Sequence, residues 1–312
     1  MSRARWWSRL DRVLTLTEHL LQEVTGAGVD ARSFDEHDAF RWDAERGPGR
    51  LVPVEGVQGF DLDDLVGVDS AIARLVANTE QFVRGLPSNN VLLHGERGTG
   101  KSSAVKGLLR RFSSRGLRLV EVQREALIHL PRILAALRRD GGRHRFLVFC
   151  DDLSFGRDEG GYRELKAALE GGLEGPPENV RIVATSNRRH LLPETMADNR
   201  KAWLDDDNEL HLGEGLEERL ALSDRFGLVI GFYNFDQPTY LAIVARYLRK
   251  AGFLPRPGDA GGEALVDGLP DAVRAEALRF TVVRASRSGR VARQFVDDFL
   301  GREGLSCAEA QQ

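Results

Sequence analysis

Residues 90–102 read NVLLHGERGTGKS, a short apolar run that leads into a glycine-rich loop ending in lysine and serine. The end of this stretch, from Gly95 to Ser102, fits the phosphate-binding pattern G-x-x-x-x-G-K-[ST] at every fixed position. Gly95, Gly98 and Gly100 let the backbone curl so that its N–H groups face an anion, a conformation that side chains would obstruct. The loop follows a predicted strand and precedes a predicted helix, whose positive dipole end points at the anion. The segment therefore predicts a phosphate-binding site.

The phosphate-binding pattern also predicts contacts for individual side chains. Lys101 is predicted to contact the β- and γ-phosphates of a nucleotide, and the hydroxyl of Ser102 to ligate Mg²⁺. The remaining loop residues, Glu96, Arg97 and Thr99, join them as nucleotide-binding positions. A nucleotide and Mg²⁺ are therefore the expected ligands.

A pair of adjacent aspartates predicts the second half of this site. The stretch FLVFCDDLSF, residues 146–155, runs five largely apolar residues into Asp151 and Asp152. In nucleotide sites an acid at the end of a strand holds Mg²⁺, usually through water, and we predict this role for Asp151. Asp152 then stands where a general base orients the attacking water. A single aspartate after a strand is also common as a helix cap or turn residue, but here two follow the most apolar strand.

The pattern of apolar runs predicts an α/β fold. From about Leu62, runs short enough for strands alternate with stretches whose apolar residues recur three or four apart. Continuous apolar strands between amphipathic helices imply a mostly parallel sheet covered by helices, with ligands beyond the carboxyl ends of the strands. The strands are expected at 90–95, 117–123, 145–152, 180–187 and 225–232.

We predict three parts along the chain. Residues 1–60 form an N-terminal helical extension and a linker, and the linker, with short turns, covers 26–60. Residues 61–235 form the α/β nucleotide-binding domain, and residues 236–312 form a helical lid domain. Tryptophan and leucine recur at helical spacing in the extension, which predicts an amphipathic helix docked on the body. Binding to a membrane surface or a partner is the alternative for this helix.

Composition excludes some classes of protein. The chain has 312 residues with 42% hydrophobic and 29% charged residues, which is ordinary for a soluble protein. Its net charge of -3 gives no bulk attraction to nucleic acid or anionic membrane, and its basic clusters carry no aromatic interleaving. No stretch approaches the roughly 18 consecutive apolar residues of a membrane span. Cys150 and Cys307 have neither disulfide-framework nor metal-ligand spacing, so a cytoplasmic protein is expected.

The motifs together resemble those of AAA+ ATPases. Their order and approximate spacing match over residues 60–300, through LDDLVGVDSAIARLVANTEQFVRG at 62–85, the phosphate loop, FLVFCDD, IVATSN and LSDRFG. Within that superfamily the chain resembles a bacterial group catalogued as domain of unknown function 815, whose DDLSF segment it shares. The resemblance implies a P-loop ATPase with ATP and Mg²⁺ as cofactors, assembled as a homo-oligomer.

The resemblance also implies roles for residues around the nucleotide. Val66 and Gly67 resemble the segment whose backbone flanks adenine. Asn187 resembles the first sensor, a polar side chain that reaches the γ-phosphate and the attacking water. An asparagine in an ordinary strand-end turn is the alternative interpretation of Asn187.

Two further roles fall to arginines. Arg225 in SDRFG resembles the arginine finger, which reaches the γ-phosphate of the neighbouring subunit and offsets transition-state charge. A surface salt bridge to Asp224 is the alternative. In SGRVARQF, residues 288–295, Arg293 has the usual spacing of the second sensor, an arginine that closes over the nucleotide, and Arg290 competes for that role.

The chain departs from the family pattern in two places. The family usually has glutamate as the water-positioning base, whereas Asp152 is shorter by one methylene, roughly 1.5 Å. Misplacing a catalytic group by about 1 Å can cost on the order of 100-fold in rate, so slow turnover is expected. The long acidic stretch over 188–224 predicts an insertion that touches a substrate or partner.

These features predict an ATPase that remodels or loads a macromolecule, with a protein partner favoured over nucleic acid. The first alternative is a binding switch or loader in which bound ATP orders the insertion and lid while hydrolysis is slow or absent. The second is a small-molecule kinase that shares only the phosphate loop.

Overall fold

The structure is a computed structural model of the 312-residue chain. It describes residues 32–44, 49–57, 59–154, 160–171, 177–187, 203–204, 210–211, 223–255 and 268–309. The amphipathic helix predicted near the N-terminus and most of the predicted insertion lie outside the described residues.

A seven-stranded sheet forms the centre of the fold, with strand order β2-β1-β4-β5-β6-β3-β9. All neighbouring strands pair in parallel except β1 with β2, so the predicted mostly parallel sheet is confirmed. The strands are β1 (Ala39–Asp43), β2 (Arg50–Pro53), β3 (Val91–Gly95), β4 (Leu117–Glu121), β5 (Arg145–Cys150), β6 (Val180–Ser186) and β9 (Leu228–Phe232).

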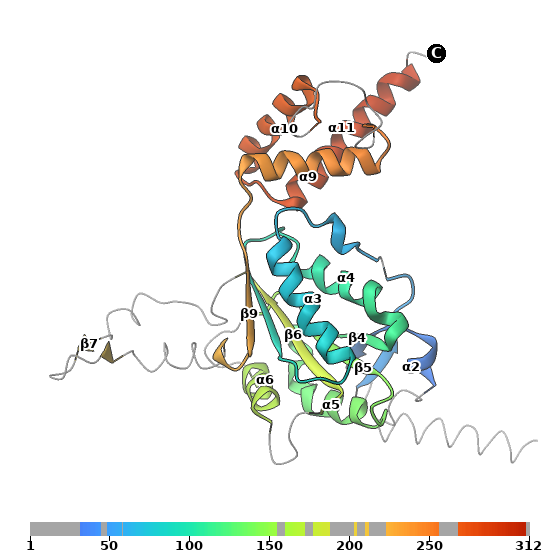
Figure 1. The fold of residues 1–312 in the computed structure, drawn as a ribbon, viewed down its shortest axis with the longest axis vertical. Coiled ribbons are helices and arrows are strands. Elements are labelled where there is room, and N and C mark those ends of the chain that lie inside the picture. The colour runs from blue at the N-terminus through green and yellow to red at the C-terminus, as the bar shows by residue number, and fades with distance from the viewer. Residues whose placement is uncertain are drawn as a thin grey trace, which may run out of the picture.

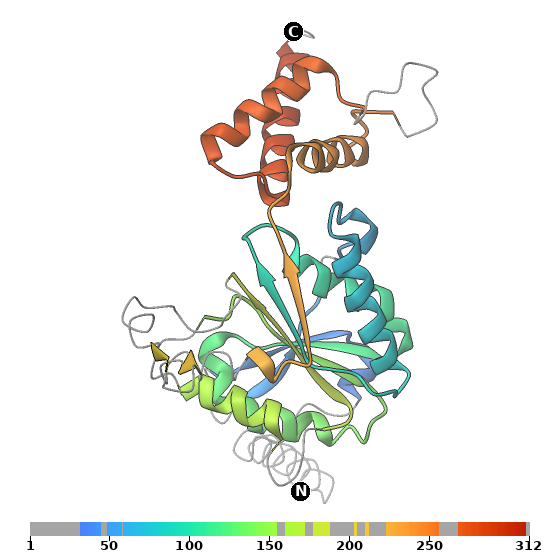
Figure 2. The same ribbon diagram turned by 60° about the vertical axis from the view of Figure 1, so that its left-hand side comes forward.

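Helices cover both faces of this sheet (Figures 1 and 2). Helices α3 (Asp69–Val83) and α4 (Lys101–Phe112) pack on one face, and η3 (Arg124–His129), α5 (Leu130–Arg138) and α6 (Gly160–Glu170) on the other. Because side chains alternate across a strand, the apolar run of β5 serves both cores. Leu147 and Phe149 enter the core under α3 and α4, whereas Phe146 and Val148 enter the opposite one.

The segment before residue 60 extends the sheet. The linker predicted over 26–60 is therefore wrong for its described part, where α2 (Ser33–Glu36), β1 and β2 form and β1 pairs with β4. Phe40 and Trp42 are buried on either side of the exposed Arg41, and Phe34 packs edge-on against Phe40 with ring centroids 5.0 Å apart. Because the strand is short and set among charged residues, the alternation of its buried and exposed residues was not recognised from the sequence.

Replacing Phe40 with alanine is expected to lower the free energy of unfolding by about 3–5 kcal/mol, because a fully buried aromatic ring leaves a cavity. Urea denaturation of the full chain measures this loss. Arg41→Ala is the matched control on the same strand, and its exposed side chain should change stability by less than about 0.5 kcal/mol. Equal stability of the two variants would show that β1 does not belong to the cooperative fold.

The C-terminal region is helical, as expected, and lies beyond the carboxyl ends of the strands (Figure 1). It contains α9 (Gln237–Lys250), α10 (Asp271–Arg284) and α11 (Gly289–Glu309). The Asp236 carboxylate caps α9 by accepting from the Thr239 N–H at 2.9 Å. Within the described residues, no helix combines the length and the apolar character needed to cross a bilayer. The boundaries predicted at residues 60 and 235 remain predictions.

Candidate functional site

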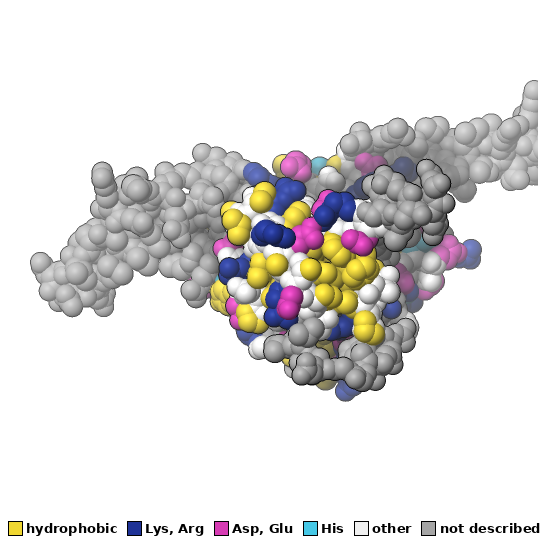
Figure 3. Space-filling view, turned by 90° about the horizontal axis from the view of Figure 1, so that it is seen from above, with side chains coloured by type: hydrophobic (Ala, Val, Ile, Leu, Met, Phe, Trp, Pro, Cys, Tyr) yellow, Lys and Arg dark blue, Asp and Glu magenta, His cyan; other side chains and the backbone are white. Residues whose placement is uncertain are grey.

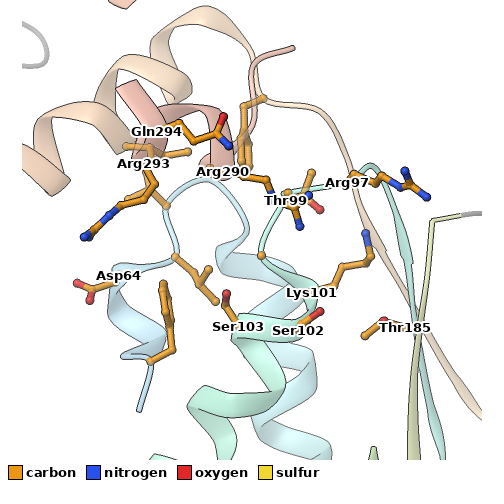
Figure 4. Close-up of a pocket in the computed structure, with 18 of the residues that line it drawn as sticks. Asp64, Arg97, Thr99, Lys101, Ser102, Ser103, Thr185, Arg290, Arg293 and Gln294 are labelled. Carbon is orange, nitrogen blue, oxygen red and sulfur yellow. The ribbon is translucent and has the colours of Figure 1, made fainter. Parts of the chain in front are cut away.

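A pocket of about 600 Å³ opens between the carboxyl ends of the strands and the helical lid (Figure 4). Its volume lies within the range of about 300–1,000 Å³ that is usual for small-molecule sites. Twelve of the sixteen predicted site residues line it, namely Val66, Arg97, Gly98, Thr99, Gly100, Lys101, Ser102, Asp151, Asp152, Asn187, Arg290 and Arg293. Four are not among the lining residues, namely Gly67, Gly95, Glu96 and Arg225.

The glycine-rich loop follows β3 and has the backbone that its glycines permit. Gly95, Gly98 and Gly100 have φ of 131°, 76° and 102°, all in the region that favours glycine. A Cβ at Gly95 would lie 1.8 Å from the carbonyl oxygen of Phe232 on β9. Gly95 therefore lets the loop start directly against the neighbouring strand, and Glu96 follows by donating its N–H to the same oxygen at 3.1 Å.

Gly67 does not line the pocket but contacts the lid. Its φ is 80°, and a Cβ there would lie 2.3 Å from Cγ2 of Thr239 on α9. Gly67 therefore permits close contact between the segment before α3 and the lid, while Val66 lines the pocket beside it.

Lys101 is the first residue of α4, directly after the loop, and is only 7% exposed. Its Nζ donates to the carbonyl oxygens of Gly95 at 2.8 Å and Glu96 at 2.7 Å, and to Oδ1 of Asn187 at 3.3 Å. Burial lowers the pKa of Lys101, while the nearby carboxylates of Asp152 and Asp151 act to raise it. Phosphate oxygens would give this buried cation stronger acceptors than the carbonyls it contacts now.

The two predicted metal ligands, Ser102 and Asp151, are hydrogen-bonded to each other. Oδ1 of Asp151 accepts from the hydroxyl of Ser102 at 2.7 Å and from Oγ1 of Thr185 at 2.5 Å. Strand pairing explains this, because Cys150 on β5 lies opposite Ala184 on β6, and the next residues are Asp151 and Thr185. A hydroxyl beside a carboxylate is a hard oxygen pair that suits Mg²⁺, which usually takes substrate phosphates and water as further ligands. The residues therefore fit this ion.

Asp152 adopts a left-handed backbone conformation with φ of 51°. Aspartate and asparagine enter this region more readily than other residues with side chains, which gives a physical reason for aspartate here in place of glutamate. The Asp152 carboxylate accepts a hydrogen bond from Nδ2 of Asn187, whose Oδ1 accepts from Lys101. Lys101, Asn187 and Asp152 thus form a continuous hydrogen-bonded chain.

Comparison with known proteins places the chain in a family. Residues 35–303 match the family described as protein of unknown function (DUF815). The chain belongs to this DUF815 family. No curated protein sequence matches it significantly.

Solved structures similar to this DUF815 chain include two motor or DNA-associated proteins. RuvB of Thermotoga maritima, described as a Holliday junction branch migration motor, is 16% identical with a TM-score of 0.41, over 77% of this chain and 72% of that chain. The ORC1 protein of Aeropyrum pernix, in complex with DNA, is 18% identical with a TM-score of 0.46, over 73% and 58% of the two chains.

The two candidate second-sensor arginines of the DUF815 chain differ in position. The Arg290 N–H donates to the carbonyl oxygen of Gly98 at 3.4 Å, and the side chain lies beside Thr99 and above the loop (Figure 4). Arg293 points away from the loop, where it pairs with Asp297 at 3.0 Å and lies 5.5 Å from the ring centroid of Tyr247. Both arginines line the pocket, and which of them is the second sensor stays a prediction.

Arg225 lies away from the pocket of its own chain. It precedes β9 at the end of the sheet opposite the glycine-rich loop, because β3 and β9 run in parallel. Its guanidinium forms an ion pair with Glu170 at the end of α6. The fold does not bring Arg225 to the other predicted catalytic residues of the same chain.

Thr185 and Asp64 are among the lining residues that were not predicted from sequence. Thr185 contacts Asp151, and its signal was present in IVATSN, because it lies two residues before Asn187 and so on the same face of β6. Asp64 lies in the segment LDDLVG, for which no side-chain role was predicted, and accepts from Arg246 at 3.0 Å and from Lys250 at 2.5 Å, both on α9. Burial raises the pKa of Asp64, but these two cations outweigh it and hold the pKa below its ordinary value. Asp64 thereby links the segment before α3 to the lid.

Proposed function

We propose that the protein is an AAA+-type ATPase that binds ATP with Mg²⁺ and hydrolyses it to remodel or load a macromolecular partner. The observation that carries the proposal is the meeting of three groups at one pocket. These are the glycine-rich loop, the buried Lys101, and the hydroxyl–carboxylate pair of Ser102 and Asp151. An anion site beside a hard-cation site is what a nucleotide triphosphate with Mg²⁺ requires.

Each residue has a role in the proposed reaction. Loop N–H groups and Lys101 hold the phosphates, so Lys101 exchanges its carbonyl acceptors for phosphate oxygens when ATP binds. Ser102 and Asp151 hold Mg²⁺, which when bound neutralises charge on the phosphates. Asp152 orients the attacking water and accepts its proton, and Asn187 positions both the water and Asp152.

The proposed assembly follows from the position of Arg225. Because Arg225 lies outside its own pocket, a role at a γ-phosphate requires a neighbouring subunit, and we propose a cytoplasmic homo-oligomer. Apolar side chains lie at the surface of the lid between charged ones (Figure 3), and Val282 and Val283 on α10 are 79% and 84% exposed. We propose a protein partner in preference to nucleic acid, because the net charge of -3 gives no bulk attraction to a polyanion.

A slow ATP-dependent switch is the second candidate. The observation that favours it is the hydrogen bond from Asn187 to the Asp152 carboxylate, which competes with the attacking water for the same oxygen. In this case bound ATP holds the partner-binding state and hydrolysis ends it. A small-molecule kinase is the minor alternative, and phosphate transfer to a metabolite in a product screen would identify it.

Replacing Lys101 with alanine tests the proposal directly. ATP affinity is expected to fall about 10–100-fold, because charge-assisted hydrogen bonds are worth about 1.5–3 kcal/mol and each 1.4 kcal/mol is a tenfold change in affinity. Calorimetric titration of ATP with Mg²⁺ measures the change. Lys106→Ala, an exposed lysine on the same helix, is the matched control and should bind like wild type. Unchanged affinity in Lys101→Ala would contradict the proposal.

Trapping the ATP-bound form identifies the partner. Asp152→Asn should retain ATP and therefore any partner that depends on ATP. Affinity capture with and without ATP, followed by identification of what stays bound, separates a remodelling or loading role from a self-contained switch, which would capture only copies of itself.

A further inference from the structure

We propose that Thr185 is the positioning residue that aligns both aspartates of the site through a single hydroxyl group. The inference rests on the proposed function, because the two aspartates are its metal ligand and its base. Thr185 lies on β6 and is 1% exposed, yet it borders the pocket.

The hydroxyl of Thr185 is both a hydrogen-bond donor and a hydrogen-bond acceptor. Its Oγ1 donates to Oδ1 of Asp151 at 2.5 Å and accepts from the N–H of Asp152 at 2.9 Å. A hydroxyl has one proton, so donation to Asp151 commits it and leaves the lone pairs for Asp152. One side chain therefore orients the carboxylate of Asp151 and the backbone of Asp152 together.

Further contacts to β6 fix the chain that follows β5. The N–H of Leu153 donates to the carbonyl oxygen of Thr185 at 2.7 Å, and the hydroxyl of Ser186 donates to the carbonyl oxygen of Leu153 at 2.8 Å. A left-handed residue that is not glycine persists only where its surroundings over-determine it. The hydroxyl of Thr185 makes the shorter of the two side-chain contacts to the N–H of Asp152, whose φ is 51°, and so contributes to that constraint.

Thr185 and Ser102 both donate hydrogen bonds to Asp151, but only Ser102 is also a predicted metal ligand. Oδ1 of Asp151 accepts from Ser102 at 2.7 Å, from Thr185 at 2.5 Å and from the N–H of Asp152 at 3.2 Å. In the proposed function Ser102 turns its oxygen to Mg²⁺, and the orientation of the Asp151 carboxylate then depends on Thr185 and on the more distant N–H of Asp152. Partners of metal-binding carboxylates typically change metal affinity or activity by about 10–100-fold when they are removed.

The test compares Thr185→Val with Thr185→Ser in the full chain. Valine keeps the shape and removes the hydroxyl, and serine keeps the hydroxyl. For Thr185→Val we expect kcat to fall about 10–100-fold and the Mg²⁺ concentration for half-maximal ATP hydrolysis to rise by a similar factor. KM for ATP should stay within about threefold, because the loop and Lys101 are unchanged, and Thr185→Ser should restore both values.

Thr79→Val is the matched control for the loss of a buried hydroxyl. Thr79 is 3% exposed and donates to the carbonyl oxygen of Leu75 at 2.8 Å within α3, away from the aspartates. It should leave kcat and the Mg²⁺ dependence unchanged. If Thr185→Val does not fold, as judged by circular dichroism, Thr185→Ala removes the same hydroxyl and takes its place.

The outcomes separate this inference from the proposed function. Wild-type kcat and Mg²⁺ dependence in Thr185→Val, or an equal loss in Thr185→Ser, would overturn the role of the hydroxyl while hydrolysis by the wild type still supports an ATPase. If the wild type does not hydrolyse ATP, the Mg²⁺ dependence of ATP binding takes the place of turnover. A raised Mg²⁺ requirement in Thr185→Val then supports the inference, and an unchanged requirement overturns it.

Discussion

Replacing Arg225 with alanine is expected to lower ATP turnover about 10³–10⁵-fold while ATP affinity stays unchanged, as for an arginine that offsets transition-state charge. The selective loss follows from position, because Arg225 is absent from the lining of its own pocket and cannot support ATP binding there. Phosphate release at saturating ATP and Mg²⁺ measures turnover, and calorimetric titration measures affinity.

The ion pair with Glu170 requires its own control. Glu170→Gln removes the charge partner of Arg225 and leaves the arginine in place. Turnover close to wild type in Glu170→Gln, together with the loss in Arg225→Ala, assigns the effect to the guanidinium. An equal loss in both variants would mean that Arg225 serves the local ion pair and not a neighbouring γ-phosphate.

Mixing two inactive variants tests action between subunits. Arg225→Ala subunits keep an intact pocket, and Asp152→Asn subunits keep Arg225. A mixed oligomer therefore contains intact pockets facing intact arginines, and part of the turnover should return. No recovery in a mixture shown to co-assemble would contradict this proposal, as would equal wild-type activity at dilutions where only monomer exists.

Replacing Asp152 with asparagine is expected to lower turnover about 10²–10⁴-fold, the usual contribution of a general base, with ATP binding retained. Asparagine has the same size and also tolerates the left-handed backbone, whose φ is 51° here, so the loss reports the carboxylate and not the fold. Single-turnover phosphate release measures the hydrolysis step directly. Turnover equal to wild type would remove Asp152 from the proposed reaction.

Glutamate at position 152 tests whether the site is built around the shorter side chain. We expect Asp152→Glu to lower turnover on the order of 100-fold, because one extra methylene moves the carboxylate by more than about 1 Å. The contacts of Asp152 with Asn187 and Thr185 are made at the length and backbone conformation of aspartate. A large rise in turnover would instead support the slow switch, in which aspartate limits hydrolysis.

Local chemistry made the phosphate loop, the five strands β3, β4, β5, β6 and β9, and the helical C-terminal region predictable from sequence. The loop pattern depends on residue types at fixed spacing, and its two fixed glycines, Gly95 and Gly100, have φ of 131° and 102°. Strands β3, β4, β5 and β6 are buried on both faces and so read as continuous apolar runs, whereas the edge strand β9 is only partly buried. Asp151 and Asn187 each follow one of these strands and line the same pocket, because parallel strands end at one edge of the sheet. The role of Asn187 was expected from the family resemblance alone.

Only tertiary structure decided the features that depend on residues far apart in the chain. Strand β1 is stabilised by its pairing with β4, which lies far along the chain. Because its own sequence is short and set among charged residues, it resembles a linker when that partner is not known. The lid sets the backbone of Arg290 beside Gly98 and pairs Arg293 with Asp297, and neither contact follows from the spacing of SGRVARQF.

For the two aspartates of FLVFCDDLSF, the sequence predicts the roles and the tertiary structure sets the geometry. Sequence alone indicates a metal ligand and a base, because both follow an apolar strand in a chain with a phosphate loop. The left-handed backbone of Asp152 and the shared hydroxyl of Thr185 arise from the packing of β6 against β5. These contacts join residues more than thirty positions apart, and no local pattern specifies how such side chains meet.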